Sequence, residues 1–369
     1  MKKILILSCN TGEGHNSAAH AIEDAASARG IETVITDPIS FGSEKIKTWV
    51  SSGYNNIIKR TPRLFGAIYK AGDLIDKTRL KSPIYFANAI YSDHLVDYIV
   101  SEGIDAVVST HLFGMEATTA LKRRKKIDIP CYGVLTDYTR IPFFAETSLD
   151  GYFIPHEDLR IDLLKRGIPY DRIYPTGIPV GLRFGEHIGR DEARRQLGIL
   201  PGKRIYLIMS GGVGCGNLNA MCDELLNIED TDFAAYVLVG RNKSLEQSVN
   251  ERYGNNPHIK VVPFTKKVNL YMEAADVMLS KPGGLSSTEA AVANVPLIHV
   301  MTIPGCETKN VEFFSSHGMS IYGNNEKDAI RKAKKLVFDP EASEKMRENQ
   351  RRNTHADAAI QIMNIVENG

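Results

Sequence analysis

The sequence predicts an α/β protein made of two doubly wound parallel sheets, one after the other along the chain. Three observations carry this prediction. Short apolar segments of strand length alternate with helical segments in both halves of the chain. Glycine-rich turns follow strands in both halves, and a Pro/Gly-containing stretch at residues 176–181, Thr-Gly-Ile-Pro-Val-Gly, suits a linker between the halves.

The first half begins with a short buried strand at residues 3–8, Lys-Ile-Leu-Ile-Leu-Ser, followed by a Gly-containing turn. A helix is expected over residues 16–29, because Gly30 provides a stop signal. Further strands are expected at residues 33–36, 106–110, 132–136 and 151–154.

The same alternation restarts in the second half, where strands are expected at residues 204–209, 235–239, 260–262, 277–280 and 296–301. Pro340 then precedes a polar helical tail with few apolar positions. We therefore expect an N-terminal domain at 1–178, a C-terminal domain at 179–340 and a helical tail at 341–369.

Composition narrows the class of protein. The chain has 369 residues, 43% of them hydrophobic, and a formal net charge of +1, which excludes disorder and gives no global attraction to nucleic acid. Five scattered cysteines without a C-x-x-C pair indicate neither a disulfide framework nor a zinc site. Without a signal peptide or a bilayer-spanning stretch, we expect an intracellular protein, soluble or peripheral to a membrane.

The segment 45–98 interrupts the alternation of strands and helices. Between residues 45 and 91 it carries nine basic residues and two acidic ones, together with seven aromatic residues. Cationic, aromatic-rich amphipathic helices lie in membrane interfaces. The alternative is an ordinary helical insertion with aromatic residues in the core and solvated charges.

The turn after the first strand, residues 8–17, contains Gly12, Gly14 and His15. Glycines allow a ligand to approach the backbone, and a helix N-terminus attracts negative charge. The same helix terminus disfavours imidazolium, so His15 is expected to be neutral and able to accept a proton; a surface capping histidine is the alternative. Asp37 stands where a ribose-binding acid would follow the second strand, which leaves a weak dinucleotide-binding interpretation open.

Polar residues follow two other strands of the first half. Asp137 and Tyr138 come directly after Leu135-Thr136, and His111 follows the strand 106–110. Ligands of open α/β sheets bind beyond the carboxyl ends of the strands, so His15, His111 and Asp137 are expected at one edge. A carboxylate at such an edge can act as a general base, although a turn or capping aspartate is the alternative.

Two glycine-rich loops follow strands of the second half, at residues 211–216 and 281–289. The second loop places hydroxyl groups at the start of a helix, which suits a diphosphate. Glu289, one turn into that helix, is positioned to bind ribose hydroxyls. The strand 235–239 ends in Gly240-Arg241 and not in an acid, which disfavours NAD in this half.

Together these segments resemble the lipid-glycosylating branch of glycosyltransferase family 28, the monogalactosyldiacylglycerol synthases and the processive diacylglycerol β-glucosyltransferases. In the first half the resemblance rests on residues 8–15, 109–111, 135–137 and 176–184. In the second half it rests on residues 210–216, 239–242, 263–264, 275–276, 281–289 and 303–305. Several blocks in the same order over the whole chain are more specific than any single glycine loop.

The resemblance implies a GT-B fold, with two Rossmann-like domains facing each other across a cleft. It also implies an inverting transferase that moves a hexosyl group from a UDP-sugar to a lipid hydroxyl, of diacylglycerol or a glycosyl-diacylglycerol. The enzyme would be peripheral on the cytoplasmic face of an anionic membrane and would need neither cofactor nor metal.

By the same resemblance, Asp137 is the acceptor base and His15 orients the acceptor or a lipid phosphate. Phe264 lies by the uracil, Glu289 on the ribose and the glycine loops near the diphosphate. The implied donor-binding residues are Gly211, Gly212, Gly214, Gly216, Arg241, Phe264, Lys281, Gly283, Gly284, Ser286, Ser287, Glu289, Glu307 and Asn310. The implied acceptor-binding residues are Gly12, Gly14, His111 and Tyr138, and the implied membrane contacts are Trp49, Lys59, Arg60 and Phe65.

The sequence also departs from the family pattern. Where the family has Gln-Glu-x-x-Asn, this chain has Cys306-Glu-Thr-Lys309-Asn310, a stretch that contacts the sugar in the family. The donor sugar is therefore open, and Lys309 would suit an acidic sugar such as glucuronic acid. Four rival functions remain: a MurG-like polyprenyl-linked sugar transferase, a UDP-sugar epimerase, a nucleotide-sugar-binding protein without turnover, and a nicotinamide dehydrogenase.

Overall fold

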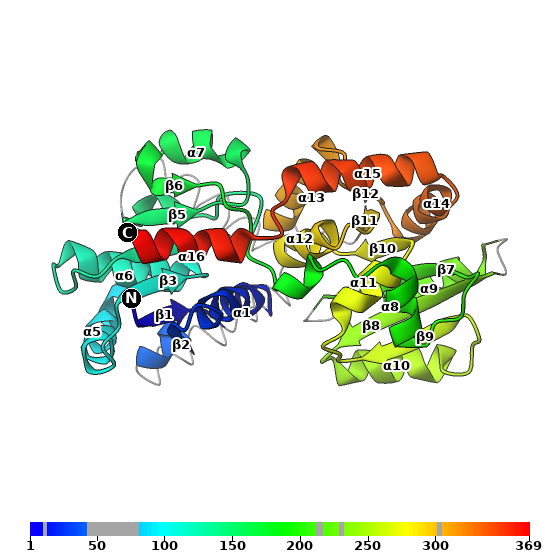
Figure 1. Cartoon of the computed structure of the whole chain (residues 1–369), viewed down its shortest axis with the longest axis horizontal. Helices are drawn as coiled ribbons and strands as arrows, with labels where there is room; N and C mark the ends of the chain where they lie inside the picture. The colour runs from blue at the N-terminus through cyan, green and yellow to red at the C-terminus, as the bar shows by residue number, and fades with distance from the viewer. Residues whose placement is uncertain (10–12, 43–80, 212–216, 229–231, 301–304) are drawn as a thin grey trace. The chain divides into compact units, whose positions relative to one another are not determined.

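The computed structural model describes residues 1–9, 13–42, 81–211, 217–228, 232–300 and 305–369 (Figure 1). The chain folds into two compact units. Unit 1 comprises residues 1–181, 304–306 and 357–369, and unit 2 comprises residues 182–303 and 307–356. Each unit contains a six-stranded parallel sheet, so the predicted α/β fold with two parallel sheets is confirmed.

The sheet of unit 1 has the strand order β2-β1-β3-β4-β5-β6. Its strands are β1 (Lys3–Leu7), β2 (Glu32–Thr36), β3 (Ala106–Ser109), β4 (Cys131–Val134), β5 (Gly151–Phe153) and β6 (Ile173–Tyr174). Its helices are α1 (Glu13–Ser27), α4 (Pro83–Ile90), α5 (Ser92–Ser101), α6 (Leu112–Arg123), α7 (Arg160–Leu164) and α16 (Ala358–Asn368).

Both faces of this sheet are buried, which explains why its strands are continuous apolar runs. Successive side chains of a strand point to opposite faces. Ile4 and Ile6 therefore pack on one face with residues of α1 and α16, while Leu5 and Leu7 pack on the other with residues of α5 and α6. The side chains of β1 thus hold helices on both faces of the sheet.

Unit 2 repeats this architecture with the strand order β12-β11-β10-β7-β8-β9. Its strands are β7 (Arg204–Met209), β8 (Phe233–Gly240), β9 (Ile259–Pro263), β10 (Val277–Ser280), β11 (Leu297–His299) and β12 (Ile321–Tyr322). Its helices are α8 (Arg190–Leu197), α9 (Leu218–Leu226), α10 (Lys243–Tyr253), α11 (Val268–Ala274), α12 (Gly284–Val292), α13 (Cys306–Ser316), α14 (Glu326–Val337) and α15 (Pro340–Asn353).

The C-terminal residues differ from the sequence-based expectation. The predicted tail, 341–369, is not a unit of its own, because α15 belongs to unit 2 and the chain then returns so that α16 belongs to unit 1. Figure 1 shows α16 in red among the elements of unit 1. Its buried residues are Ala358, Ala359, Ile362, Met363 and Val366. Unit 1 also extends to Gly181, beyond the boundary expected at residue 178.

Among the described residues, no helix combines the length and apolar character that crossing a bilayer requires.

Candidate active site

Polar residues follow three neighbouring strands of unit 1 at one edge of the sheet. The register pairs Leu7 of β1 with Ser109 of β3, and Ser109 with Gly133 of β4, so these strands end nearly level. Ser8 and Thr110 come directly after β1 and β3, and Thr136 follows β4 after one intervening residue. The carboxyl edge of the sheet thus presents hydroxyl and carbonyl groups to the start of α1.

His15, the third residue of α1, reaches across to this edge. Its Nδ1 lies 2.8 Å from the carbonyl oxygen of Thr110 and 3.1 Å from Oγ1 of Thr136. A carbonyl only accepts, so Nδ1 carries the proton and Nε2 keeps a lone pair. Burial lowers the pKa of His15, against the opposing effect of the Thr110 carbonyl. The ring is therefore neutral at neutral pH, as the sequence predicts for a helix N-terminus.

His111 packs against His15 with the ring centroids 4.6 Å apart in an edge-to-face arrangement. It is the N-cap of α6, and its Nδ1 accepts from the backbone N–H of Phe113 at 3.2 Å. Its Nε2 therefore carries the proton. Burial, followed by the charge of His15, holds the pKa of His111 well below its usual value. The structure thus brings two neutral imidazoles together.

Asp137 directly follows Thr136, the residue that contacts His15, and its side chain is partly exposed. Tyr138 is buried, and Gly14 lies in the first turn of α1. Asp37 caps the short turn Pro38–Phe41 by accepting from the N–H of Ile39 at 3.0 Å. That contact gives Asp37 a structural role in place of the ribose contact considered for a dinucleotide.

Sequence reasoning overlooked the residues that support this edge. Gly114, in the first turn of α6, has no room for a side chain, since a Cβ there would lie 2.8 Å from Cβ of Leu7 and from Oγ of Ser109. Ser8 donates to Oδ1 of Asn16 at 2.6 Å, which ties α1 to the end of β1. The available signals were a glycine inside a helical pattern and hydroxyl residues directly after buried strands.

The carboxyl edge of unit 2 is organised around Lys281, which follows β10. Its Nζ lies 2.7 Å from Oε1 of Glu307 in α13, and both side chains are mostly buried. The aliphatic part of Lys281 lies on Gly211, which has a φ of +69° and where a Cβ would come within 2.8 Å of Cε of Lys281. Only glycine suits this position, which joins the loops after β7 and β10.

The start of α12 corrects the prediction for Ser287. Gly283 is the N-cap of α12, and Ser286 donates to the Gly283 carbonyl at 3.3 Å. The hydroxyl of Ser287 is buried against Nε2 of His299 at 2.9 Å, and its N–H donates to Gly283. Ser287 therefore faces the core rather than a diphosphate, because the helical turn directs Ser286 and Ser287 to different sides.

Two neighbouring residues of α13, Asn310 and Lys309, have partners within unit 2. The buried Asn310 donates from Nδ2 to the Pro282 carbonyl at 2.9 Å, so it holds the turn after β10 in place. Lys309 is exposed and lies 2.7 Å from Glu312, one turn later on the same helix. The suitability of Lys309 for an acidic sugar stays a prediction.

Glu289 lies in the second turn of α12. Burial raises its pKa to about 7, and the nearby positive charge of Arg183 opposes that shift. A carboxyl group with such a pKa takes up or releases a proton near neutral pH. Ligand hydroxyl groups that hydrogen-bond to the ionised form would lower this pKa.

Arg241 and Phe264 form an exposed flat surface where β8 and β9 end. The guanidinium carbon of Arg241 lies 3.9 Å from the centroid of the Phe264 ring, and Phe264 is 49% exposed. A half-exposed aromatic ring at a strand end can stack on a planar base. The remaining predicted positions, Gly12, Gly212, Gly214, Gly216, Trp49, Lys59, Arg60 and Phe65, lie outside the described residues.

Comparison with known proteins identifies the family. Residues 15–180 match the monogalactosyldiacylglycerol (MGDG) synthase family, and residues 206–362 match the glycosyltransferase family 28 C-terminal domain. The chain belongs to glycosyltransferase family 28. The resemblance inferred from the sequence motifs is thereby confirmed.

The similar curated proteins include the processive diacylglycerol beta-glucosyltransferases of Bacillus pumilus (strain SAFR-032) and Bacillus subtilis (strain 168). Each is 27% identical to this chain, and each alignment covers 94% of the chain and 90% of the relative. These relatives therefore match the chain over almost its full length.

Solved structures support the fold. Acinetobacter baumannii MurG has a TM-score of 0.67 at 14% identity, with 100% of both chains covered. The UDP-GlcNAc 2-epimerase of Neisseria meningitidis, solved with UDP-GlcNAc, has a TM-score of 0.64 at 16% identity, also with 100% of both chains covered. Both are similar to this member of family 28 in architecture.

Proposed function

We propose that this family 28 member transfers a hexosyl group from a UDP-sugar to a hydroxyl of diacylglycerol or of a glycosyl-diacylglycerol. The observation that carries the proposal is the near full-length similarity to processive diacylglycerol beta-glucosyltransferases. The geometry of the two sheet edges supports it. Each edge supplies one of the two functions that such a transfer needs.

Unit 2 provides the donor site in this proposal. Phe264 and Arg241 stack on the uracil, and ionised Glu289 accepts from ribose hydroxyls. The N-terminus of α12 and the ammonium group of Lys281 face the negative charge that develops on the departing UDP. With these groups present, we expect transfer without a divalent metal, and turnover that persists in EDTA.

Unit 1 provides the acceptor site. Asp137 removes the proton from the acceptor hydroxyl, and His15, whose ring lies at the same edge of the sheet, orients the acceptor. The hydroxyl oxygen forms a bond to the anomeric carbon as the bond to UDP breaks, and the proton goes to Asp137. A single in-line displacement inverts the configuration, so an α-linked donor gives a β-glycoside.

A peripheral position on the cytoplasmic face of the membrane belongs to the same proposal. The membrane-contact residues expected within 43–80 lie outside the described residues. The adjoining helix α4, however, exposes Phe86 and Ile90, with 58% and 68% of their surface accessible. Exposed apolar side chains next to a basic segment are typical of an interfacial helix.

The test uses the full chain with UDP-glucose and vesicles that contain diacylglycerol, followed by mass spectrometry of the lipid extract. We expect a hexosyl-diacylglycerol product, abolished by Asp137→Asn while UDP binding is retained. Asp162→Asn, an exposed aspartate of α7, is the control and should be fully active. An unmodified lipid extract with every UDP-hexose offered, or an epimerised UDP-sugar as the product, would overturn the proposal.

A further inference from the structure

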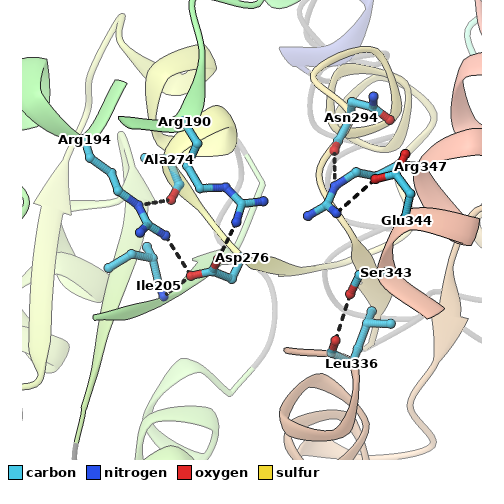
Figure 2. Close-up of polar contacts among 10 residues, drawn as sticks. All are labelled: Arg190, Arg194, Ile205, Ala274, Asp276, Asn294, Leu336, Ser343, Glu344 and Arg347. Carbon is cyan, nitrogen blue, oxygen red and sulfur yellow. Dashed lines mark hydrogen bonds and ion pairs between the residues drawn. The ribbon is translucent and has the colours of Figure 1, made fainter. Parts of the chain in front are cut away.

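Two arginines of unit 2, which are far apart in the sequence, point their guanidinium groups toward one another (Figure 2). Arg190 is the first residue of α8, and Arg347 lies in the middle of α15. Their neighbours Asp276 and Asn294 precede β10 and β11, so the pair lies at the amino edge of the sheet. The donor loops follow the carboxyl ends of the same strands.

The carboxylate on the Arg190 side is already fully engaged. Asp276 accepts from Nη1 of Arg190 and from Nη2 of Arg194, each at 2.8 Å. It also accepts from the backbone N–H of Ile205 at 2.7 Å. One negative charge is therefore shared between two guanidinium groups, and among the charges that act on Arg347 its effect is the smallest.

The groups next to Arg347 compensate its positive charge only weakly. Its Nε donates to the Asn294 carbonyl at 3.2 Å, and Nη1 lies 3.5 Å from Oε2 of Glu344. Glu344 is half-exposed and makes its shorter contact, 2.7 Å, with Arg351. Within the described part of the chain, these contacts occupy only Nε and Nη1 of Arg347.

The surroundings make this excess of positive charge costly. The side chain of Arg347 is only 18% exposed. Burial, followed by the charge of Arg190, lowers the pKa of Arg347. Two guanidinium groups that oppose each other in a partly desolvated place are stabilised by an anion that both can bind.

We propose that Arg190 and Arg347 form a binding site for a phosphate group, separate from the donor site and outside the proposed transfer reaction. The planar forks of two guanidiniums can each give parallel N–H bonds to phosphate oxygens. Asp276 keeps Arg190 in place and, with both its oxygens occupied, does not compete for the forks. Two sources offer this chemistry: free phosphate and the headgroup of an anionic phospholipid.

The first test is calorimetric titration of the full chain with inorganic phosphate at low salt, because salt screens such contacts. Saturating UDP is present, so that the donor site is filled. We expect phosphate binding that the double variant Arg190→Gln/Arg347→Gln weakens at least 10-fold. Arg195→Gln, an exposed arginine of α8 paired with Glu192, is the control and should bind like the wild type.

Arg347→Lys separates the effect of charge from that of geometry, since lysine keeps the positive charge but lacks the planar pair of N–H donors of a guanidinium group. Its affinity should fall between those of the wild type and the double variant. Circular dichroism and thermal unfolding in phosphate-free buffer show whether each variant is folded.

Vesicle flotation distinguishes the sources. If the site binds a lipid headgroup, the double variant should float with phosphatidic acid vesicles less than the wild type does. Flotation with phosphatidylcholine vesicles should then be the same for both proteins. Phosphate binding with unchanged flotation assigns the site to free phosphate. Equal phosphate affinity and equal flotation in the wild type and the double variant would overturn the proposal, and that result would leave the transfer reaction unaffected.

Discussion

The Nδ1 of His15 lies 2.8 Å from the carbonyl oxygen of Thr110 and thereby fixes which ring nitrogen carries the proton. This contact joins the first turn of α1 to the end of β3 and leaves Nε2 as an acceptor. The residue proposed to orient the acceptor hydroxyl is thus set by the backbone of a strand. The same contact makes the role of His15 testable.

His15→Gln should reduce kcat/KM for transfer roughly 2- to 12-fold, since one hydrogen bond that positions the acceptor contributes about 0.5–1.5 kcal/mol. UDP affinity should not change, because His15 belongs to unit 1. Steady-state kinetics with diacylglycerol vesicles measures the loss. His94→Gln, an exposed histidine of α5, is the control. Full activity of His15→Gln would remove His15 from the proposed site.

Phe264→Ala should weaken UDP binding, since base stacking on an aromatic ring contributes about 1–3 kcal/mol, or roughly 5- to 150-fold in Kd. Phe338→Ala is a matched control, because Phe338 is also a half-exposed phenylalanine of unit 2 beneath an arginine, Arg204 at 4.9 Å. Calorimetric titration with UDP measures both variants. Equal affinities in the two variants would contradict the placement of uracil on Phe264.

Glu289 gives UDP binding a pH dependence. Its pKa is raised to about 7 by burial, and only its ionised form is a strong acceptor for ribose hydroxyls. The Kd for UDP should therefore rise as the pH falls from 8 to 6. Glu289→Gln should bind UDP more weakly at pH 8 and lose this dependence, whereas the exposed Glu341→Gln should retain it. A Glu289→Gln profile parallel to that of the wild type would refute the ribose contact.

The sequence predicts the sheets better than it predicts side-chain directions. A strand with both faces buried is a continuous apolar run, so β3 and β10 are visible without coordinates. The residues after these strands, His111 and Lys281, are therefore placed at the correct edges. The sequence does not distinguish Ser286 from Ser287. Consecutive residues of a helix point in different directions, so one hydroxyl faces the surface and the next faces the core. The tail is predicted as one unit, because the short break between the polar helix α15 and the helix α16 leaves little trace in composition.

A buried acid, Glu116 of α6, is a further feature that periodicity does not reveal. Its Oε2 accepts from Nδ2 of Asn88, whose Oδ1 accepts from the hydroxyl of Tyr91, and its Oε1 has no hydrogen-bond partner among the described residues. Glu146 accepts from the backbone N–H of Ser82 at 2.7 Å. Burial and a neighbouring carboxylate both disfavour the ionised form of a carboxyl group. Burial, followed by the charge of Glu146, accordingly raises the pKa of Glu116 well above its usual value.

This pair predicts how stability depends on pH. A carboxyl group with a raised pKa in the folded state gives stability that is complete below its unfolded pKa and is lost as the pH rises through the folded value. Lys81, whose pKa burial lowers to about 8, and Arg123 are the cations nearby, and both variants retain them. Glu116→Gln has no carboxyl group to ionise at this buried position, so its melting temperature relative to the wild type should increase from pH 5 to pH 9.

Thermal unfolding at fixed ionic strength across that range measures the difference between Glu116→Gln and the wild type. Glu341→Gln, which replaces an exposed carboxylate of α15, should follow the wild type at every pH. A difference between Glu116→Gln and the wild type that stays constant with pH would mean that the pKa of Glu116 is not raised in the folded protein.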